Sequence, residues 1–177
     1  MIRIATCEDV PAILNIYAPY ILTSTATFEY DVPCKKEFTQ RFLKYTEKFP
    51  WLVWEEDGRI LGYAYASAPF ERAAFSWCAE PSVYLVPEAK GRGIGRALYE
   101  ELERILCKQG YQRLLALITS ENAESIAFHQ KMGYSFCGEF PRCGYKFGRW
   151  LGLTWMEKQL KFVENPSGFP VDWMSIV

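Results

Sequence analysis

Residues 87–106, PEAKGRGIGRALYEELERIL, decide the fold of this chain. They follow the apolar, strand-like run SVYLV (82–86), and three glycines at alternate positions lead directly into a helical pattern that ends near Gly110. Glycine has no Cβ, so a glycine-rich loop exposes consecutive backbone N–H groups to a ligand. The order strand, glycine loop, helix therefore predicts a loop and a first helical turn that face the same ligand.

An anion is the ligand that such a loop favours. The first amides of a helix have no intrahelical partner, and the helix dipole attracts negative charge. Basic side chains stand within and beside the loop: Lys90, Arg92 and Arg96. The sequence therefore predicts a phosphate site at Gly91, Gly93 and Gly95, and a flexible turn without a ligand is the alternative.

Two common phosphate motifs do not fit this loop. The P-loop needs a Lys-Ser or Lys-Thr after its last glycine, and none follows here. The dinucleotide fingerprint G-x-G-x-x-G would need a glycine where Arg96 stands. The P-loop is therefore excluded, and the dinucleotide fingerprint matches poorly.

The composition is that of one globular domain. The chain has 177 residues, half of them hydrophobic, and 20 basic against 21 acidic residues give a formal net charge of −1. This balance gives no support for binding nucleic acid or an anionic membrane. No apolar run approaches the roughly 20 residues of a membrane span, and the first ten residues lack the apolar core of a secretory signal. A cytoplasmic protein is expected.

The cysteines and the single histidine argue against a metal site. The six cysteines form no C-x-x-C pair, and His129 is the only histidine. A zinc site would need an unusual set of ligands from these residues. We expect free, mostly buried thiols and no metal.

Hydrophobic periodicity predicts a mixed α/β chain with one domain over residues 1–177. A proline-rich tail over about 161–177 either packs as a strap or covers a partner surface. In the first half of the chain we expect a strand near the N-terminus, helices over 10–21 and 35–49, and a hairpin over 51–69 that turns at Asp57-Gly58. A strand over 73–87, with a bulge or bend near Glu80-Pro81, then leads to the glycine loop and its helix. The remaining expected elements are a strand over 113–119, a helix over 121–133, and strands over 134–140 and 150–160.

The glycine loop resembles the acyl-CoA loop of the GNAT superfamily of N-acetyltransferases. That loop has the pattern [QR]-x-x-G-x-[GA], which appears here as Lys90-Gly91-Arg92-Gly93-Ile94-Gly95 with lysine at the first position. Downstream, NAESIAFHQKMGY resembles the second signature of the superfamily, an N-x-x-[AS] helix that ends in Gly-Phe or Gly-Tyr. Asn122 and Ser125 occupy its first positions.

The resemblance extends from Ile2 to about Leu160 and is most similar to the phosphinothricin and methionine sulfoximine N-acetyltransferase branch. It implies an α/β (α+β) acyl-CoA N-acyltransferase fold, with a mixed, mostly antiparallel sheet flanked by helices. It also implies acetyl-CoA as co-substrate. The coenzyme residues that it implies are Val83, Tyr84, Leu85, Lys90, Gly91, Arg92, Gly93, Ile94, Gly95, Arg96, Asn122 and Ser125.

Acetyl transfer to an amine needs a group that removes a proton from the substrate ammonium. The resemblance implies this role for Glu80 in WCAEPSVYL. Burial beside Trp77 and Tyr84 would raise the pKa of its carboxyl, whereas a solvated edge-strand glutamate is the alternative. Backbone N–H groups over 83–85 are expected to bind the thioester oxygen and the pantetheine arm.

The leaving thiolate must gain a proton, and many members of the superfamily use a tyrosine in the second helix. His129 stands at that position, and an imidazole can protonate a thiolate. A packing or surface histidine is the alternative. Tyr134 is a further candidate donor, with a core aromatic as its alternative reading.

Substrate contacts are expected from two aromatic segments. The resemblance places Glu29 near the substrate. Phe28, Tyr30, Phe70, Arg72 and Phe75 cluster around the acids in the sequence, and an arginine among aromatics suits a carboxylate or phosphinate. The alternative is that the aromatics are core and Arg72 is solvated.

The sequence thus predicts an acetyl-CoA-dependent N-acetyltransferase of a small amino-acid-like amine, of the phosphinothricin, methionine sulfoximine or methionine sulfone type. Another amine (a polyamine, an aminoglycoside or a peptide N-terminus) and a non-catalytic acyl-CoA-binding module are the alternatives. A homodimer is expected, because the apolar tail FPVDWMSIV and tryptophans 150 and 155 look too exposed for an isolated domain.

Overall fold

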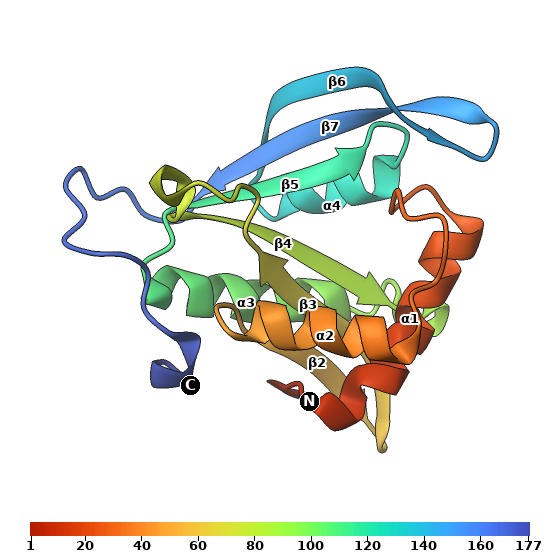
Figure 1. The fold of residues 1–177 in the computed structure, drawn as a ribbon, viewed down its shortest axis with the longest axis horizontal. Coiled ribbons are helices and arrows are strands. Elements are labelled where there is room, and N and C mark those ends of the chain that lie inside the picture. Colours follow the sequence, from red (N-terminus) through yellow and green to blue (C-terminus); the bar gives the residue numbers. More distant parts are fainter.

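A computed structural model describes residues 1–177 (Figure 1). Its seven strands form one sheet in the order β1-β2-β3-β4-β5-β7-β6, in which only the β4–β5 pair is parallel. The helices are α1 (Val10–Thr23), α2 (Lys35–Thr46), α3 (Ile94–Gln109) and α4 (Ala123–Lys131). The strands are β1 (Ile2–Ile4), β2 (Trp51–Glu56), β3 (Arg59–Ser67), β4 (Cys78–Leu85), β5 (Arg113–Thr119), β6 (Ser135–Lys146) and β7 (Arg149–Gln159). The predicted mixed, mostly antiparallel sheet with flanking helices is confirmed.

Helices cover both faces of the sheet, and each face has its own core. Figure 1 shows α2 in front of the sheet and α3 and α4 behind it. On the first face, α1 and α2 bury Ile13 and Phe38 against Trp51 and Tyr63. In the opposite core, Leu98, Leu102 and Leu106 of α3 cluster with Leu114 of β5 and Met156 of β7. Each fully buried side chain of this size contributes about 1.5–3 kcal/mol to folding.

The sheet opens between β4 and β5. These strands pair only at Cys78↔Arg113 and Ala79↔Leu114, and beyond that point they diverge. On its other side, β4 stays paired with β3 up to Leu85. The irregularity expected near Glu80-Pro81 is therefore the point where β4 leaves β5, and the β3–β4 ladder has no bulge there.

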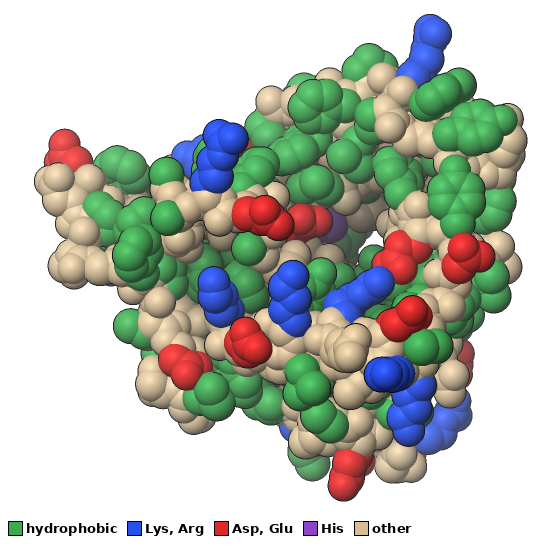
Figure 2. All heavy atoms as spheres, viewed as in Figure 1, with side chains coloured by type: hydrophobic (Ala, Val, Ile, Leu, Met, Phe, Trp, Pro, Cys, Tyr) green, Lys and Arg blue, Asp and Glu red, His purple; other side chains and the backbone are tan.

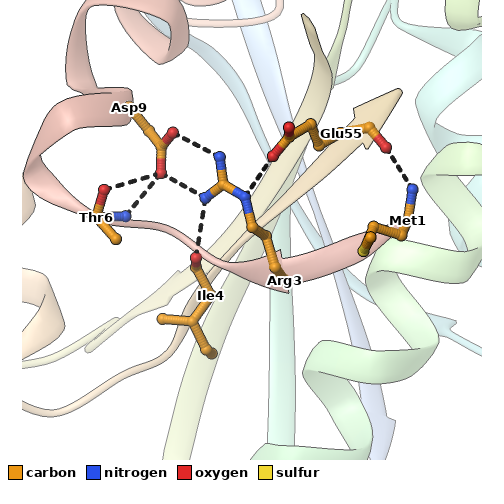
Figure 3. Close-up of polar contacts among 6 residues, drawn as sticks. All are labelled: Met1, Arg3, Ile4, Thr6, Asp9 and Glu55. Atoms are coloured by element: carbon orange, nitrogen blue, oxygen red, sulfur yellow. Dashed lines mark hydrogen bonds and ion pairs between the residues drawn. The ribbon is translucent and has the colours of Figure 1, made fainter. Parts of the chain in front are cut away.

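The N-terminal strand is fixed by one arginine (Figure 3). The Arg3 guanidinium donates to both Asp9 carboxylate oxygens at 2.7 and 2.8 Å, and its Nε donates to Glu55 at 2.5 Å. Asp9 also accepts from the Thr6 N–H at 2.7 Å, as in a capping box ahead of the first helix. These contacts hold β1 to β2 and to the start of α1.

Some boundaries differ from the sequence-based expectations. The second helix ends at Thr46, and 73–75 form a short 3₁₀ turn ahead of β4. β6 runs to Lys146 with register shifts, because pairing with β7 extends it through Pro141 and Gly144. The Asp57-Gly58 turn is confirmed, with φ of 51° and 73°.

The C-terminal tail packs on its own chain. Trp173 is buried, and its Nε1 donates to Thr46 O at 2.8 Å, while Trp77 stacks on Phe169. The expectation of an exposed apolar tail is therefore wrong for Trp173, although Phe169 remains exposed. No helix of the structure has both the length and the apolar character needed to cross a membrane.

Candidate active site

A cleft of about 460 Å³ opens where β4 and β5 diverge. Figure 2 shows this face of the molecule hollowed, with acidic and basic side chains around the hollow. Glu80 and His129 line the cleft, together with all the predicted coenzyme residues except Arg92 and Ile94. Ile94 is instead buried in the core, and the Arg92 side chain turns to Glu56 at 2.8 Å. One cavity thus brings together residues from three distant segments of the sequence.

The glycine loop forms one end of the cleft. Gly91 and Gly93 have φ of 74° and 80°, a left-handed conformation that favours glycine, and Gly93 is the N-cap of α3. Gly95 also lines the cleft. A side chain at this position would crowd its neighbours, because a Cβ would lie 3.3 Å from Leu85 Cδ1 and 3.9 Å from the Phe128 ring. The open N-terminus of α3 is therefore a site for an anion, as expected.

The loop's cations are held by carboxylates. Lys90 Nζ lies 3.1 Å from Glu124 on α4, so this pair spans the two helix N-termini that border the cleft. Arg96 pairs with Glu100 at 2.7 Å. All of these side chains are partly exposed, so such pairs exchange readily for another anion.

The first turn of α4 forms the wall beside the loop. Asn122 caps this helix, with its side-chain oxygen accepting from the Ser125 N–H at 3.1 Å. Ser125 and Phe128 line the cleft one turn apart. The second signature is thus a capped helix end whose side chains face the glycine loop.

The free edge of β4 offers backbone groups to the cleft. Val86 N–H donates to Leu61 O in β3, so by the alternation of an antiparallel ladder Tyr84 faces β3, while Val83 and Leu85 face away from it. The Tyr20 hydroxyl binds both backbone groups of Leu85: it donates to Leu85 O at 2.7 Å and accepts from the Leu85 N–H at 3.3 Å. Of the three expected donors, only the Val83 N–H therefore points into the cleft without a side-chain partner, and the Tyr84 N–H belongs to the ladder.

Glu80 is the first residue of β4 beyond its last pair with β5. Burial raises the pKa of its carboxyl from 4.5 to about 7, and no ion pair offsets that burial. The Trp77 ring stacks on Phe169 of the tail, and its Nε1 donates to Gly168 O at 3.2 Å. A buried carboxyl with a pKa near neutrality can accept a proton at physiological pH.

Both ring nitrogens of His129 have partners inside the protein. Nδ1 lies 2.8 Å from Ser125 O, and Nε2 lies 2.8 Å from the hydroxyl of Tyr99, which is itself 3.2 Å from Pro81 O on β4. Burial lowers the pKa of the imidazole. His129 therefore lines the cleft as a buried, hydrogen-bonded histidine rather than a surface residue.

Tyr134 lies outside the cleft. Its hydroxyl donates to Glu103 at 3.1 Å, and the Glu103 carboxylate also binds Lys158 at 2.6 Å. The ring is buried in the α3 core. This position fits a core aromatic side chain and not a proton donor to the thiolate.

Glu29 is held in place by two helices. Its carboxylate accepts from Arg41 on α2 at 2.6 and 3.2 Å and from the Tyr17 hydroxyl on α1 at 2.7 Å. Although burial opposes it, these donors lower the pKa of the carboxyl. Phe28, Glu29 and Tyr30 do not line the cleft itself, but Ala26 of the same connection does.

The second expected substrate segment lies in the exposed connection between β3 and β4. Arg72 and Phe75 are exposed, and Arg72 has no ion-pair partner. The Phe75 ring packs 4.5 Å from Phe70, which stacks on Trp155 at 6.0 Å. The structure thus groups aromatics beside a free guanidinium but outside the residues that line the cleft.

Comparison with known proteins agrees with this geometry. Residues 2–155 match the family model of the acetyltransferase (GNAT) domain. The chain belongs to the GNAT acetyltransferase family. It is accordingly an N-acetyltransferase.

Named GNAT relatives cover most of the chain. It is 38% identical over 162 residues to a phosphinothricin N-acetyltransferase of Alcaligenes faecalis, covering 90% of this chain and 82% of the relative. It is 36% identical over 164 residues to an L-methionine sulfoximine/L-methionine sulfone acetyltransferase of Pseudomonas aeruginosa, covering 90% and 94%. A crystal structure of a GNAT superfamily phosphinothricin acetyltransferase from Sinorhizobium meliloti in complex with AcCoA superposes with a TM-score of 0.88, at 36% identity, over 97% of this chain and 93% of that chain.

Sequence reasoning missed several residues of this GNAT site. Tyr20 lines the cleft, and Tyr99 contacts His129. Both lie on helices among apolar residues. The available signal is the tyrosine hydroxyl, because a buried tyrosine usually finds a hydrogen-bond partner.

Proposed function

We propose that the chain transfers the acetyl group of acetyl-CoA to the amino group of a small amino-acid-like substrate, of the phosphinothricin, methionine sulfoximine or methionine sulfone type. One observation carries the proposal: Glu80, with a pKa near 7, lies where β4 and β5 part, in the same cleft as the glycine loop. The named relatives support the substrate class.

Acetyl-CoA fits the cleft in one direction. Its phosphates suit the α3 N-terminus at Gly93 and the cations Lys90 and Arg96. The pantetheine arm then runs along β4, which brings the thioester oxygen to the free Val83 N–H. This donor would stabilise the oxyanion that forms when the amine attacks.

The proton balance assigns a role to Glu80. Over the whole reaction the substrate ammonium loses two protons, the CoA thiolate gains one, and one is released to solvent. We propose that the Glu80 carboxylate accepts the first proton, directly or through a water, so that a neutral amine attacks the thioester carbon. A pKa near 7 keeps a large fraction of this base ionised at neutral pH.

His129 is the proposed source of the proton for the thiolate: one imidazolium N–H would leave its internal partner and pass its proton to the sulfur, the ring would return to the neutral form, and solvent would restore the proton. As an imidazolium it would donate Nε2–H to the Tyr99 oxygen, and the Tyr99 hydroxyl hydrogen would turn to Pro81 O. The charged ring would then have a partner for each N–H. This supports a transient charge on a buried histidine.

The substrate side is proposed to use the connection that carries Phe28, Glu29 and Tyr30 together with Arg72 and Phe75. The unpaired Arg72 guanidinium suits the carboxylate of an amino acid. Glu29, whose oxygens are taken by Arg41 and Tyr17, supports this wall of the site by position rather than by proton transfer.

We also propose a cytoplasmic homodimer. Exposed aromatics on the edge strand β6 and the hairpin it forms with β7 support self-association: Phe136, Phe140, Tyr145, Phe147 and Trp150. All six cysteines are free thiols, which suits a reducing compartment, but the expectation that most are buried is wrong, since Cys7, Cys34, Cys137 and Cys143 are exposed. Sedimentation at micromolar concentration should give twice the chain mass, and a monomer would contradict the dimer.

Release of CoA thiol tests the function. We expect rapid release with phosphinothricin, methionine sulfoximine or methionine sulfone and slow release with polyamines, aminoglycosides and peptides. A preference for a polyamine or peptide would overturn the substrate class. Tight acetyl-CoA binding without release for any amine would instead indicate a binding module.

A further inference from the structure

Lys146 is a buried cation outside the cleft. It is the last residue of β6, and only 2% of its surface is exposed. Its Nζ donates to Ser24 O and Thr27 O, both at 2.8 Å, and lies 5.0 Å from the centre of the Phe147 ring. No carboxylate forms an ion pair with it. Burying an ammonium group is costly, so these two carbonyl contacts need an explanation.

The two carbonyls belong to the connection between α1 and α2, residues 24–34. None of these residues is helix or strand, so their backbone groups depend on contacts from elsewhere. The Tyr30 hydroxyl donates to Tyr145 O, beside Lys146. The Phe28 ring lies against Gly144, where an added Cβ would be 2.5 Å from a ring carbon. Three consecutive residues of β6 thus hold this connection.

The same connection forms a wall of the cleft. Ala26 lines the cleft between the two Lys146 contacts, and the Thr119 hydroxyl at the end of β5 donates to Thr25 O. The glycine loop and α4 also line the cleft, and the Thr25 hydroxyl donates to Glu121, just before α4, at 2.8 Å. Displacement of 24–34 would therefore change a part of the cleft that the glycine loop does not form.

Besides the contacts of Thr25 with Thr119 and Glu121, the connection is held from the helices and from the hairpin. Arg41 and Tyr17 fix Glu29 from the helices, while Lys146 fixes Ser24 and Thr27 from the hairpin. The helix contacts lie within the neighbouring layer, whereas Lys146 links residues more than 100 positions apart. Loss of the Lys146 contact would release the connection on the side that faces the hairpin.

We propose that Lys146 is a positioning residue that fastens residues 24–34 to the β6–β7 hairpin and thereby shapes the amine half of the active site. The proposal rests on the proposed function for the identity of that half. It also makes a claim about the 24–34 connection that needs no substrate.

The test compares Lys146→Met with Lys158→Met. Lys158 is a matched control because it also lies on the β6–β7 hairpin, but its Nζ binds the Glu103 carboxylate at 2.6 Å instead of the backbone carbonyls of residues 24–34. In Lys146→Met we expect KM for the amine to rise ~10-fold or more, as for a displaced binding wall, with acetyl-CoA affinity within about twofold of wild type. Lys158→Met should leave both constants near wild type.

Hydrogen exchange supplies a readout that is independent of any amine. Amides of 24–34 should exchange faster in Lys146→Met and not in Lys158→Met. Unchanged exchange in folded Lys146→Met would overturn the fastening, and faster exchange with an unchanged amine KM would overturn its role in the site. Failure of wild-type protein to acetylate any amine would overturn the proposed function while leaving the exchange result readable.

A second variant covers the case in which Lys146→Met does not fold. Gly144→Ala keeps the charge but pushes a methyl group against the Phe28 ring. We expect the same rise in amine KM and the same faster exchange over 24–34. A folded Gly144→Ala with wild-type amine KM and exchange would count against the proposal.

Discussion

The Tyr99 hydroxyl lies 2.8 Å from Nε2 of His129 and 3.2 Å from the carbonyl oxygen of Pro81. Because Ser125 O can only accept, Nδ1 of His129 carries a hydrogen. In the neutral ring Nε2 then accepts from Tyr99, and in the charged ring it donates to Tyr99, whose hydrogen turns to Pro81. The hydroxyl thus connects the protonation state of His129 with the strand that carries Glu80.

Tyr99→Phe should lower the pKa of His129, because the charged ring loses the acceptor of its Nε2–H and charged hydrogen bonds are the stronger ones. His129 is the only histidine, so one imidazole signal in an NMR titration reports this pKa directly. We also expect kcat to fall by about tenfold or more with acetyl-CoA affinity preserved. An unchanged imidazole titration would show that the hydroxyl does not serve the charged ring.

Glu80→Gln should separate binding from chemistry. The amide keeps the size of the side chain but cannot accept the proton, so acetyl-CoA should still bind while turnover falls ~10²- to 10⁴-fold. Wild-type kcat/KM should rise with pH through about 7, the pKa of Glu80, and this limb should be absent from the variant. The deficit should shrink toward pH 9, where more amine is already neutral. Wild-type turnover at pH 7 would remove Glu80 from the mechanism.

Glu80→Gln should also change stability, in a pH-dependent way. Burial raises the carboxyl pKa from 4.5 to about 7, so the folded chain holds a proton that the unfolded chain has lost between these values. Wild-type stability from this group is therefore present below pH 4.5 and is lost as pH rises to 7. Relative to wild type, the variant should gain at most about 3 kcal/mol at pH 8 and little at pH 4.5, measured by urea unfolding. An equal increment at both pH values would contradict the linkage.

Local signals accounted for much of this fold. Asp57-Gly58 reads as a tight turn, and Gly110 and Gly133 read as helix ends, because each needs a positive φ that the sequence marks with glycine or aspartate. The phosphate end of the site could be predicted for the same reason, because its geometry depends on Gly91, Gly93 and Gly95, which lie within five positions of one another.

Contacts between residues far apart in the chain could not be predicted from the sequence. Tyr99 and His129 are 30 residues apart, and Lys146 lies more than 100 residues from the carbonyls that it binds. The extension of β6 to Lys146 also escaped the pattern, because Pro141 and Gly144 interrupt its alternation and only the β7 partner holds it extended. A side chain's partner depends on how strands and helices pack, and one sequence does not specify that pairing.

Gly93→Asp should weaken acetyl-CoA binding strongly while the fold survives. The substitution puts a negative charge at the N-cap of α3, where phosphate is expected. Gly58→Asp is the matched control, because Gly58 has φ of 73° and open space around it, like Gly93 at 80°, but lies in the β2–β3 turn. Calorimetry should show the loss only for Gly93→Asp. Equal acetyl-CoA affinity in both folded variants would remove the phosphate site from the glycine loop.

Glu124→Gln should tighten acetyl-CoA binding. Glu124 holds Lys90 across the mouth of the cleft at 3.1 Å, so its charge both occupies the cation and repels an incoming phosphate. An exposed pair of this kind is weak, which limits the expected gain to about two- to fivefold at low salt and less at high salt. Glu101→Gln is the control, because Glu101 pairs with Arg104 on α3 and does not line the cleft. Acetyl-pantetheine, which lacks the phosphates, should bind Glu124→Gln and wild type alike. A gain of the same size for acetyl-pantetheine would place the effect at the pantetheine arm, and weaker acetyl-CoA binding would show that Glu124 orders Lys90 for the phosphate instead of competing with it.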